Sequence, residues 1–362
     1  MSFDPNKPYN ELLLLPPTGE LETKAILKKT ISASRALAEL KGATNRIPNP
    51  SILINSIILQ EAKSSSEIEN IVTTNDELYK AISAKANGSS TSAKEVVRYS
   101  EALWEGFNEL KIRKVLATNL YVKIFQKIKD TDAGIRNTPG TKLQNPTTKE
   151  VIYTPPEGET IIRNLLSNLE KYIHSDEDNI DPFIKSSIIH YQFESIHPFS
   201  DGNGRTGRIL LVLYYVLKGY LDLPILFLSK YIIENKNAYY SLLRNVTERQ
   251  EWEPWILYML EGIEQTSNNT VSLIDRINTS LKGTLEKVKL EKQIRIPKEV
   301  VELIYEQPYC KTEFITDRNI SARKAAERYL KELERLKVLI PEKVGKEVLY
   351  INTELFKILS GE

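Results

Sequence analysis

The stretch HPFSDGNGRTGR, residues His197–Arg208, brings a histidine, a carboxylate, three glycines and two arginines together in one short motif. It separates two segments, 181–196 and 209–220, whose apolar residues recur at helical spacing. In the first of them Ile189, Phe193 and Ile196 fall on one face. The motif is therefore predicted to be a loop between two buried helices, within a mainly α-helical fold.

Most of the remaining chain has the same helical pattern. Apolar periodicity and good helix formers predict helices over 20–44, 51–72, 92–111, 119–130, 158–173, 229–248 and 251–281. Residues 134–156 break the pattern, because Asn-Pro and Pro-Gly pairs precede an alternating EVIY, as is typical of a short hairpin. A hairpin inserted into a helical bundle is a candidate lid or clamp.

The last part of the chain changes character. Residues 284–296 are charged and linker-like. Residues 297–362 follow the order of three helices and a two-stranded wing, with Gly345 at its turn, which is typical of a winged helix-turn-helix. We therefore expect an N-terminal helical extension (1–110), a core (111–283), this linker and a small winged-helix-like domain.

Composition narrows the class of protein. The chain has 362 residues and a net charge of +1, which gives no global attraction to nucleic acid or acidic membranes. No apolar run approaches the roughly 18 residues of a membrane span, and residues 1–20 lack a signal-peptide pattern. A cytoplasmic protein without a membrane partner is expected. The one cysteine, Cys310, excludes an internal disulfide, and with only three histidines it argues against a zinc site.

The glycines of the motif lie where a loop enters a helix. Unpaired N–H groups at a helix N-terminus bind anions, and glycines let a ligand approach the backbone. Gly202, Asn203 and Gly204 are therefore predicted to cradle a phosphate. Arg205 and Arg208, three residues apart on the following helix, can hold further phosphate oxygens, so the site suits a polyphosphate.

Two further side chains complete the predicted chemistry. Asp201 offers a hard oxygen ligand for a Mg²⁺ ion that bridges the phosphates. His197 can accept a proton from an attacking hydroxyl near neutral pH. Each residue alone has a structural alternative, since Asp201 can cap the helix and the histidine can pack. Together they indicate a magnesium-nucleotide site for nucleotidyl or phosphoryl transfer.

The stretch resembles the signature of the Fic family, HPFx(D/E)GNGRxxR, at every position. The resemblance covers about residues 10–283 and implies a Fic-type helical bundle with a β-hairpin flap. Fic proteins usually transfer AMP from ATP to a hydroxyl of a target protein. The resemblance therefore implies ATP and Mg²⁺ as cofactors, attack at the α-phosphorus and release of pyrophosphate.

The resemblance also implies roles for the motif residues. His197 would be the base for a Tyr, Ser or Thr hydroxyl of the target, and Asp201 would bind Mg²⁺. The cradle residues would hold the α- and β-phosphates, with Arg205 and Arg208 at the β- and γ-phosphates. Self-modification is compatible with this chemistry.

Two other segments resemble parts of the same family. Residues 142–153 are similar to the flap that holds a target segment by strand addition, with a plain surface loop as the alternative. In ENKNAYYSLL, the side chains of Asn235, Tyr239 and Tyr240 are candidates for the base site. Paired tyrosines on a helix also pack in protein cores, so that alternative stays open.

The stretch SSSEIEN resembles the inhibitory motif (S/T)xxxE(G/N) of the self-inhibited Fic class, through Ser65, Glu69 and Asn70. From composition alone Glu69 is a solvated helix charge. The resemblance implies instead an ion pair between Glu69 and Arg208, which would misplace the γ-phosphate. It also implies a second use of Glu69, in removing AMP from a modified target.

The winged-helix-like domain raises the question of DNA binding. Residues 297–362 contain 12 Lys and Arg against 12 Asp and Glu, so the net charge is 12 − 12 = 0. A neutral module attracts DNA poorly, so protein docking or homodimerisation is favoured. Two alternative functions stay open. One is a Fic-fold enzyme that transfers another nucleotide or phosphate-containing group, and the other is a nucleotide-sensing DNA-binding regulator.

Overall fold

The computed structural model describes residues 3–47, 49–83, 90–144, 148–291, 294–344 and 347–361. Within these ranges the chain is mainly helical, with a few short strands in two small sheets, as the sequence predicts. None of the helices in the described ranges is both long and apolar enough to cross a bilayer.

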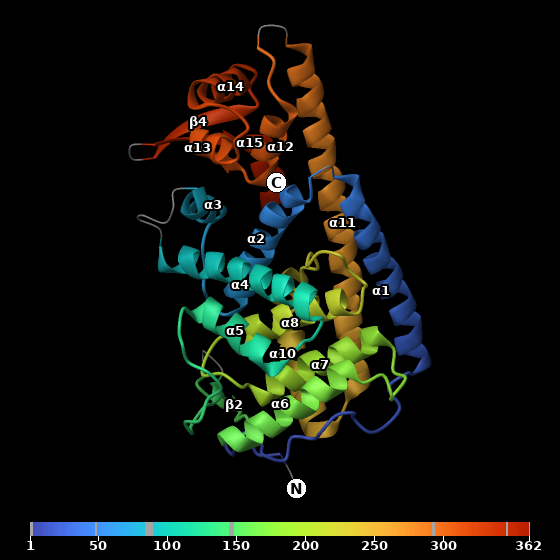
Figure 1. Ribbon diagram of the computed structural model, residues 1–362. Coiled ribbons are helices and arrows are strands. Elements are labelled where there is room, and N and C mark those ends of the chain that lie inside the picture. Colours follow the sequence, from blue (N-terminus) through green and yellow to red (C-terminus); the bar gives the residue numbers. More distant parts are fainter. Residues whose placement is uncertain are drawn as a thin grey trace.

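The helical body surrounds the motif. Its helices are α1 (Lys24–Ala43), α2 (Pro50–Ile68), α3 (Asn75–Ser83), α4 (Thr91–Arg113), α5 (Thr118–Lys129), α6 (Glu159–His174), α7 (Pro182–Ile196), α8 (Asn203–Leu217), α9 (Leu228–Glu234), α10 (Lys236–Arg249) and α11 (Trp252–Leu290). The long helix α11 packs along α1 on one side of the body, and α4 and α5 cover another side (Figure 1). The body thus encloses α7 and α8, which carry the two ends of the motif.

Helix α7 lies in the middle of the core. Its buried residues occupy all sides of the helix, which is the pattern of a fully enclosed helix. The start is well defined, because the Asp181 side chain accepts the Phe183 N–H and Pro182 occupies the first helical turn. The predicted stripe of Ile189, Phe193 and Ile196 is buried. A helix held in this way gives the motif a rigid base.

Two predicted elements of the body and linker differ from the structure, and one helix is additional. The segment expected as one helix over 229–248 breaks at Asn235 into α9 and α10. Helix α3 was not expected. The predicted linker is helical as far as Leu290, because Lys, Glu and Leu are good helix formers and one side of this helix can remain solvated.

A β-hairpin lies at the lower edge of the body (Figure 1), within the range predicted for it. Strands β1 (Leu143–Gln144) and β2 (Val151–Tyr153) pair antiparallel, with Leu143 opposite Tyr153. Residues 145–147 of the predicted flap lie outside the described residues. The N-terminal segment runs beside the hairpin, since the Tyr9 N–H donates to the Thr154 carbonyl at 3.0 Å.

The C-terminal elements form a separate layer above the body, against α2 and the upper part of α11 (Figure 1). They are α12 (Lys298–Glu306), β3 (Tyr309–Cys310), α13 (Thr312–Asp317), α14 (Arg323–Arg335), β4 (Leu339–Val344), β5 (Glu347–Asn352) and α15 (Thr353–Ser360). The strands form one antiparallel sheet in the order β3-β5-β4. The predicted turn residue Gly345 lies outside the described residues, and β3 and α15 were not expected.

Candidate active site

The loop between α7 and α8 is anchored by an aromatic contact with α5 and by the side chain of Asn203. Phe199 is buried and stacks on Phe125 of α5, with ring centroids 4.2 Å apart and planes 4° apart. The Asn203 side chain accepts the Phe199 N–H and donates to its carbonyl, both at 2.8 Å. The side chain of Asn203 therefore closes the loop, and only its backbone N–H is left for the predicted cradle.

The predicted cradle already contains a carboxylate. Gly202 precedes α8 with φ +75°, a conformation that favours glycine. The first backbone hydrogen bond of α8 runs from Thr206 to Gly202, so the preceding N–H groups are those that bind anions at a helix start. A Cβ atom on Gly204 would stand 2.4 Å from Glu69 Oε1. The Glu69 carboxylate thus lies directly against the backbone at the helix N-terminus.

Arg208 and Glu69 form the ion pair that the resemblance implies. The Arg208 Nη2 atom lies 3.0 Å from Glu69 Oε1, and its side chain is only 2% exposed. Arg208 also donates from Nε to Ser65 Oγ and from Nη2 to the Ser65 carbonyl, both at 2.9 Å. Burial lowers the pKa of Arg208, but Glu69 and neighbouring groups raise it above its ordinary value.

The C-terminal end of α2 is held by cations. Its last carbonyls have no partner within the helix and carry the negative end of the helix dipole. Arg208 binds the carbonyl of Ser65, and Lys236 of α10 donates to the carbonyl of Ile68 at 2.7 Å. Asn70 then turns the chain away with φ +61°. Glu69 is thereby fixed at the point where α2 meets α8 and α10.

Arg205 is placed differently from its predicted position beside Arg208. Its side chain is 1% exposed, and Nη1 lies 2.7 Å from Glu95 Oε1 of α4. Lys129 bridges the same Glu95 carboxylate and Asp201, at 3.0 and 2.7 Å. Arg205 therefore anchors α8 to α4 and is not a lining residue of the cavity described below.

The His197 imidazole is held at the C-terminal end of α7. The residue has φ +48°, and its N–H donates to the Phe193 carbonyl at 3.1 Å. Arg136, which is buried, donates from Nε to the His197 carbonyl at 2.8 Å. Burial lowers the pKa of His197 to about 4, with Arg136 acting in the same direction and a hydrogen bond to the Glu194 backbone, Glu69 and Asp201 acting against it. The ring is neutral at pH 7 and can accept a proton.

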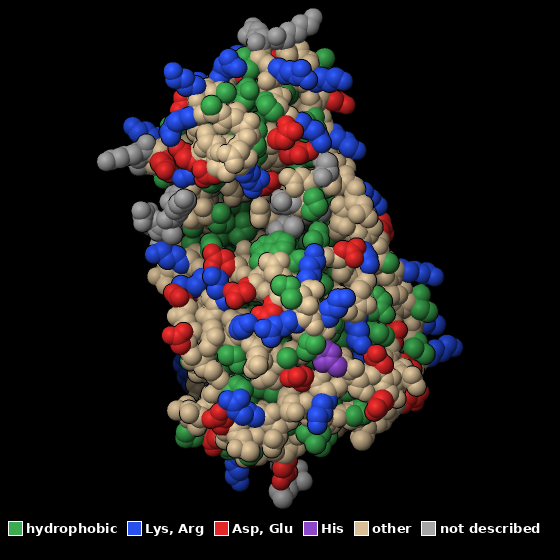
Figure 2. Space-filling model, in the orientation of Figure 1, with side chains coloured by type: hydrophobic (Ala, Val, Ile, Leu, Met, Phe, Trp, Pro, Cys, Tyr) green, Lys and Arg blue, Asp and Glu red, His purple; other side chains and the backbone are tan. Residues whose placement is uncertain are grey.

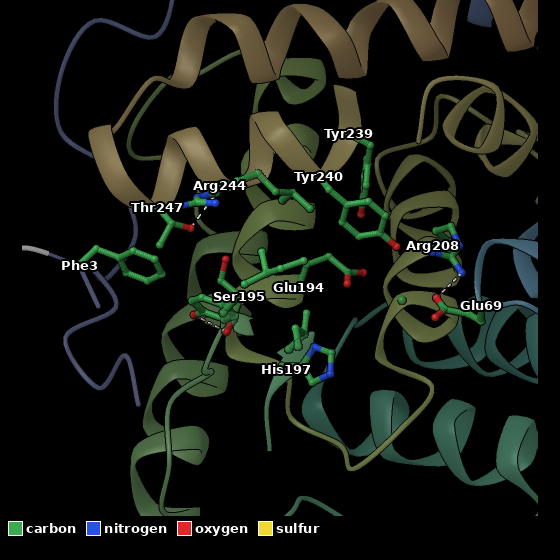
Figure 3. A pocket seen from close by; sticks show the side chains of 15 residues that line it. Phe3, Glu69, Glu194, Ser195, His197, Arg208, Tyr239, Tyr240, Arg244 and Thr247 are labelled. Carbon is green, nitrogen blue, oxygen red and sulfur yellow. Dashed lines mark hydrogen bonds and ion pairs between the residues drawn. The ribbon is translucent and has the colours of Figure 1, made fainter. Parts of the chain in front are cut away.

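A cavity of about 130 Å³ connects these groups. Figure 3 shows the Glu69–Arg208 pair on one side, His197 below, and Thr247 and Phe3 on the other side. Hairpin residues Leu143, Ile152 and Tyr153 also line it. The structure thus brings the predicted base, the cradle and the hairpin to one cavity.

The three residues predicted to contact the nucleotide base, Asn235, Tyr239 and Tyr240, are not equivalent. Tyr240 lines the cavity and is 40% exposed. Tyr239 touches the cavity, but it is buried, and its hydroxyl bonds to His190 Nε2 at 2.9 Å in the aromatic core. Asn235 lies at the junction of α9 and α10, donates to the Tyr231 carbonyl and does not belong to the cavity lining. Core packing therefore accounts for most of the Tyr239 side chain.

Sequence reasoning did not identify three residues of the site. Glu95 pairs with Arg205, Arg136 holds the His197 carbonyl, and Glu194 of α7 faces the cavity. Glu95 and Arg136 lie far from the motif along the chain, so no spacing rule connects them to it. Glu194 offered a signal, since it is the one acidic residue of α7 and lies three residues before His197.

Asp201, paired with Lys129 at 2.7 Å and outside the cavity lining, is the predicted residue that could hold Mg²⁺ beside a bound nucleotide. Among the described residues, no three or more His, Cys, Asp or Glu side chains are grouped to hold a metal by themselves. Mg²⁺ needs only one or two carboxylates when phosphate oxygens and water supply the other ligands. The Asp201 side chain is 63% exposed at the entrance to α8. The carboxylate of Glu69 at Gly204 shows that this helix start accommodates an anionic group.

Comparisons with known proteins assign three parts of the chain. Residues 27–108 match the Fic/DOC family N-terminal domain, residues 111–215 match the Fic/DOC family domain, and residues 281–355 match the C-terminal domain of SoFic-like protein adenylyltransferases. These matches cover the SSSEIEN stretch, the motif and most of the C-terminal elements respectively.

Curated relatives are named as adenylyltransferases. The chain is 29% identical over 193 residues to a probable protein adenylyltransferase of Aquifex aeolicus, covering 52% of this chain and 55% of that protein. It is 30% identical over 112 residues to protein adenylyltransferase fic-1 of Caenorhabditis elegans, covering 31% of this chain and 21% of that protein. The chain thus spans about half, or less, of the length of these relatives.

Solved structures share the fold. A Fic family protein from Desulfovibrio desulfuricans has a TM-score of 0.59 at 18% identity, covering 93% of this chain and 98% of that chain. Fic-1 from Caenorhabditis elegans has a TM-score of 0.52 at 19% identity, covering 69% of this chain and 73% of that chain. At these identities the likeness shows a common fold.

Proposed function

The chain belongs to the Fic/DOC family, and we propose that it is a self-inhibited protein adenylyltransferase that transfers AMP from ATP to a protein hydroxyl. One observation carries the proposal: a neutral, cavity-facing His197 lies beside an anion-binding helix start whose arginine is held by a glutamate. The adenylyltransferase names of the curated relatives support the same reaction.

In this proposal His197 removes the proton from the target hydroxyl. The hydroxyl oxygen forms a bond to the α-phosphorus of ATP, the bond to the bridging oxygen breaks, and pyrophosphate leaves with the electron pair. A bound triphosphate is negative and raises the pKa of the imidazole from about 4, which makes it a stronger base at the moment of transfer. Arg136 and the left-handed conformation of His197 fix the backbone that carries the ring.

The start of α8 and Arg208 would hold the triphosphate. The helix N-terminus offers backbone N–H groups and the positive end of its dipole, and Arg208 offers a planar cation for phosphate oxygens. Mg²⁺ would be held by Asp201 and would neutralise phosphate charge. Arg205 contributes indirectly, because its bond to Glu95 fixes the first turn of α8.

We assign the self-inhibition to Glu69. Its carboxylate takes the Arg208 guanidinium and lies against Gly204, so it competes with a phosphate for both partners. Ser65 and Asn70 support it, the first through two bonds to Arg208 and the second by ending α2. A second proposed use of Glu69 is to position water for removing AMP, and Glu69→Gly should then fail to release AMP from a pre-labelled target.

The hairpin is proposed to hold the target. Strands β1 and β2 form a two-stranded sheet beside the cavity, and a peptide in extended form can add to its edge. Backbone bonding of this kind would present a side-chain hydroxyl toward His197. Contacts of β2 with α7, such as the Tyr153 hydroxyl on the Ser195 carbonyl at 2.8 Å, would keep the edge in position.

The C-terminal residues 297–362 are proposed to form a winged-helix-like module for protein docking or homodimerisation. Figure 2 shows basic and acidic side chains interspersed over this upper part of the molecule, with no face of one sign in that view. This distribution agrees with the zero net charge of the segment and disfavours DNA. Salt-dependent retention on DNA that disappears when residues 297–362 are deleted would reverse this choice.

The test uses ATP labelled at either the α- or the γ-phosphate. Wild type, Glu69→Gly and His197→Ala are incubated with Mg²⁺ and each ATP, and label on protein is measured after denaturation. We expect α-label alone, strongest in Glu69→Gly and absent in His197→Ala. Transfer of γ-label would indicate a kinase reaction instead. Absence of label from every variant would favour another transferred group or a nucleotide sensor.

A further inference from the structure

One buried group in the cavity has no role in the mechanism above. Glu194 of α7 lines the cavity, and its Oε1 atom is shielded from solvent without a hydrogen-bond partner among the described residues. An unpaired carboxyl oxygen in such a place costs free energy unless a ligand supplies a donor. Oε1 lies against Gly207, so the other carboxyl oxygen, Oε2, is the one that can meet a ligand in the cavity, and it points to a bound hydroxyl or amine.

The carboxyl is held at a defined place by Gly207. A Cβ atom on Gly207 would stand 2.3 Å from Glu194 Oε1 and 3.0 Å from the Phe193 ring. Only glycine therefore lets the Glu194 side chain lie flat against α8, one turn beyond the cradle residue Gly204. The carboxyl therefore lies in a space on α8 that Gly207 leaves open.

Its place along the cavity identifies the part of the ligand it meets. In Figure 3 Glu194 lies between the Glu69–Arg208 pair at one end and Ser195 and Thr247 toward the other. With phosphates at the Arg208 end, the next part of a nucleotide is the sugar, before the base. Carboxyl groups commonly accept hydrogen bonds from ribose hydroxyls.

Charge makes a phosphate the poorer partner. An ionised carboxylate repels phosphate oxygens and only the protonated form can donate to one, whereas a sugar hydroxyl can donate to the carboxyl group in either form. Burial raises the pKa of Glu194 to about 7, opposed by Arg208 and assisted by Glu69. The tyrosines of α10 and the neutral His197 also face this region. In both protonation states Glu194 keeps an acceptor oxygen for a hydroxyl.

We propose that Glu194 binds the ribose of the nucleotide through its 2′-hydroxyl and so selects ribonucleotides over deoxyribonucleotides. This inference rests on the proposed nucleotide site. It adds a specificity-determining residue that neither accepts the reaction proton nor contacts the phosphates.

The experiment measures the dissociation constants of ATP and dATP by calorimetry in a Glu69→Gly/His197→Ala background, which exposes the cradle and prevents turnover. We expect about tenfold tighter binding of ATP than of dATP, as one hydrogen bond to a carboxyl group contributes. Adding Glu194→Ala should abolish this preference, because the affinity for ATP falls to about that for dATP while the affinity for dATP is nearly unchanged. Glu194→Gln keeps one acceptor oxygen and should retain a few-fold preference. Glu177→Ala, which removes an exposed carboxylate elsewhere, should retain the full preference.

The outcomes distinguish failure of the ribose assignment from failure of the proposed nucleotide site. Binding of ATP with no preference over dATP, or equal loss of both nucleotides in Glu194→Ala with an unchanged melting temperature, would overturn the ribose assignment alone. Failure of the background protein to bind either nucleotide would overturn the nucleotide site and the ribose assignment together. Loss of the melting transition in Glu194→Ala would leave the decision to Glu194→Gln, whose side chain has the same shape.

Discussion

Replacing Glu69 with glycine should release the proposed inhibition by a predictable amount. The pair joins an Arg208 side chain that is 2% exposed to a Glu69 side chain that is 32% exposed, at 3.0 Å. A hydrogen bond between charged groups contributes about 1.5–3 kcal/mol, and the partial exposure of Glu69 favours the lower half of that range. Arg208 keeps both hydrogen bonds to Ser65, so its guanidinium loses its ion-pair partner but still has hydrogen-bond acceptors. About 1.5–2 kcal/mol corresponds to a roughly 10- to 30-fold change in binding.

The assay is incorporation of α-phosphate label into protein at ATP concentrations below saturation. We expect the initial rate to rise about 10- to 30-fold in Glu69→Gly. The matched control is Glu67→Gly, which removes an exposed carboxylate in the last turn of α2 and introduces the same backbone freedom. An unchanged rate in Glu69→Gly, or an equal rise in the control, would refute the competition between Glu69 and phosphate for Arg208.

Three further predictions follow from single contacts. In the Glu69→Gly protein kcat/KM should fall only below about pH 5. Burial lowers the pKa of His197 to about 4, and the proton-accepting form is lost as the pH falls through that value. A pH–rate profile in which kcat/KM already falls near an ordinary histidine pKa would contradict this. Replacing Lys236 with methionine removes the 2.7 Å hydrogen bond to the Ile68 carbonyl at the end of α2, which holds Glu69 in place. Incorporation of α-label should rise by about 3- to 10-fold, less than in Glu69→Gly. No rise would show that the end of α2 is held without Lys236. Phe199→Ala removes the ring stacked on Phe125 and should lower the free energy of unfolding by about 3–5 kcal/mol, measured by urea unfolding. A decrease below about 1 kcal/mol would show that Phe199 does not anchor the loop.

Local patterns were enough to predict the frame of this molecule. Apolar periodicity predicted α7 and α8, and the glycine-rich junction between them predicted a helix start suited to an anion. These features depend on residues a few positions apart, which the helix geometry itself brings onto one face. The same locality explains the errors, because nothing within 229–248 signalled the break at Asn235, and the charges after residue 283 suggested a linker where the helix continues.

Some features of the site also follow from the sequence, and others depend on how the helices pack. The sequence by itself determined the motif, and its resemblance to a known family predicted the Glu69–Arg208 pair. Only the tertiary structure decided that Arg205 is held by Glu95 and that Tyr239 belongs mainly to the core. The physical reason is distance along the chain. Whether a charge meets a ligand, a partner or solvent depends on which helices pack against it, and that packing is settled by the whole core at once.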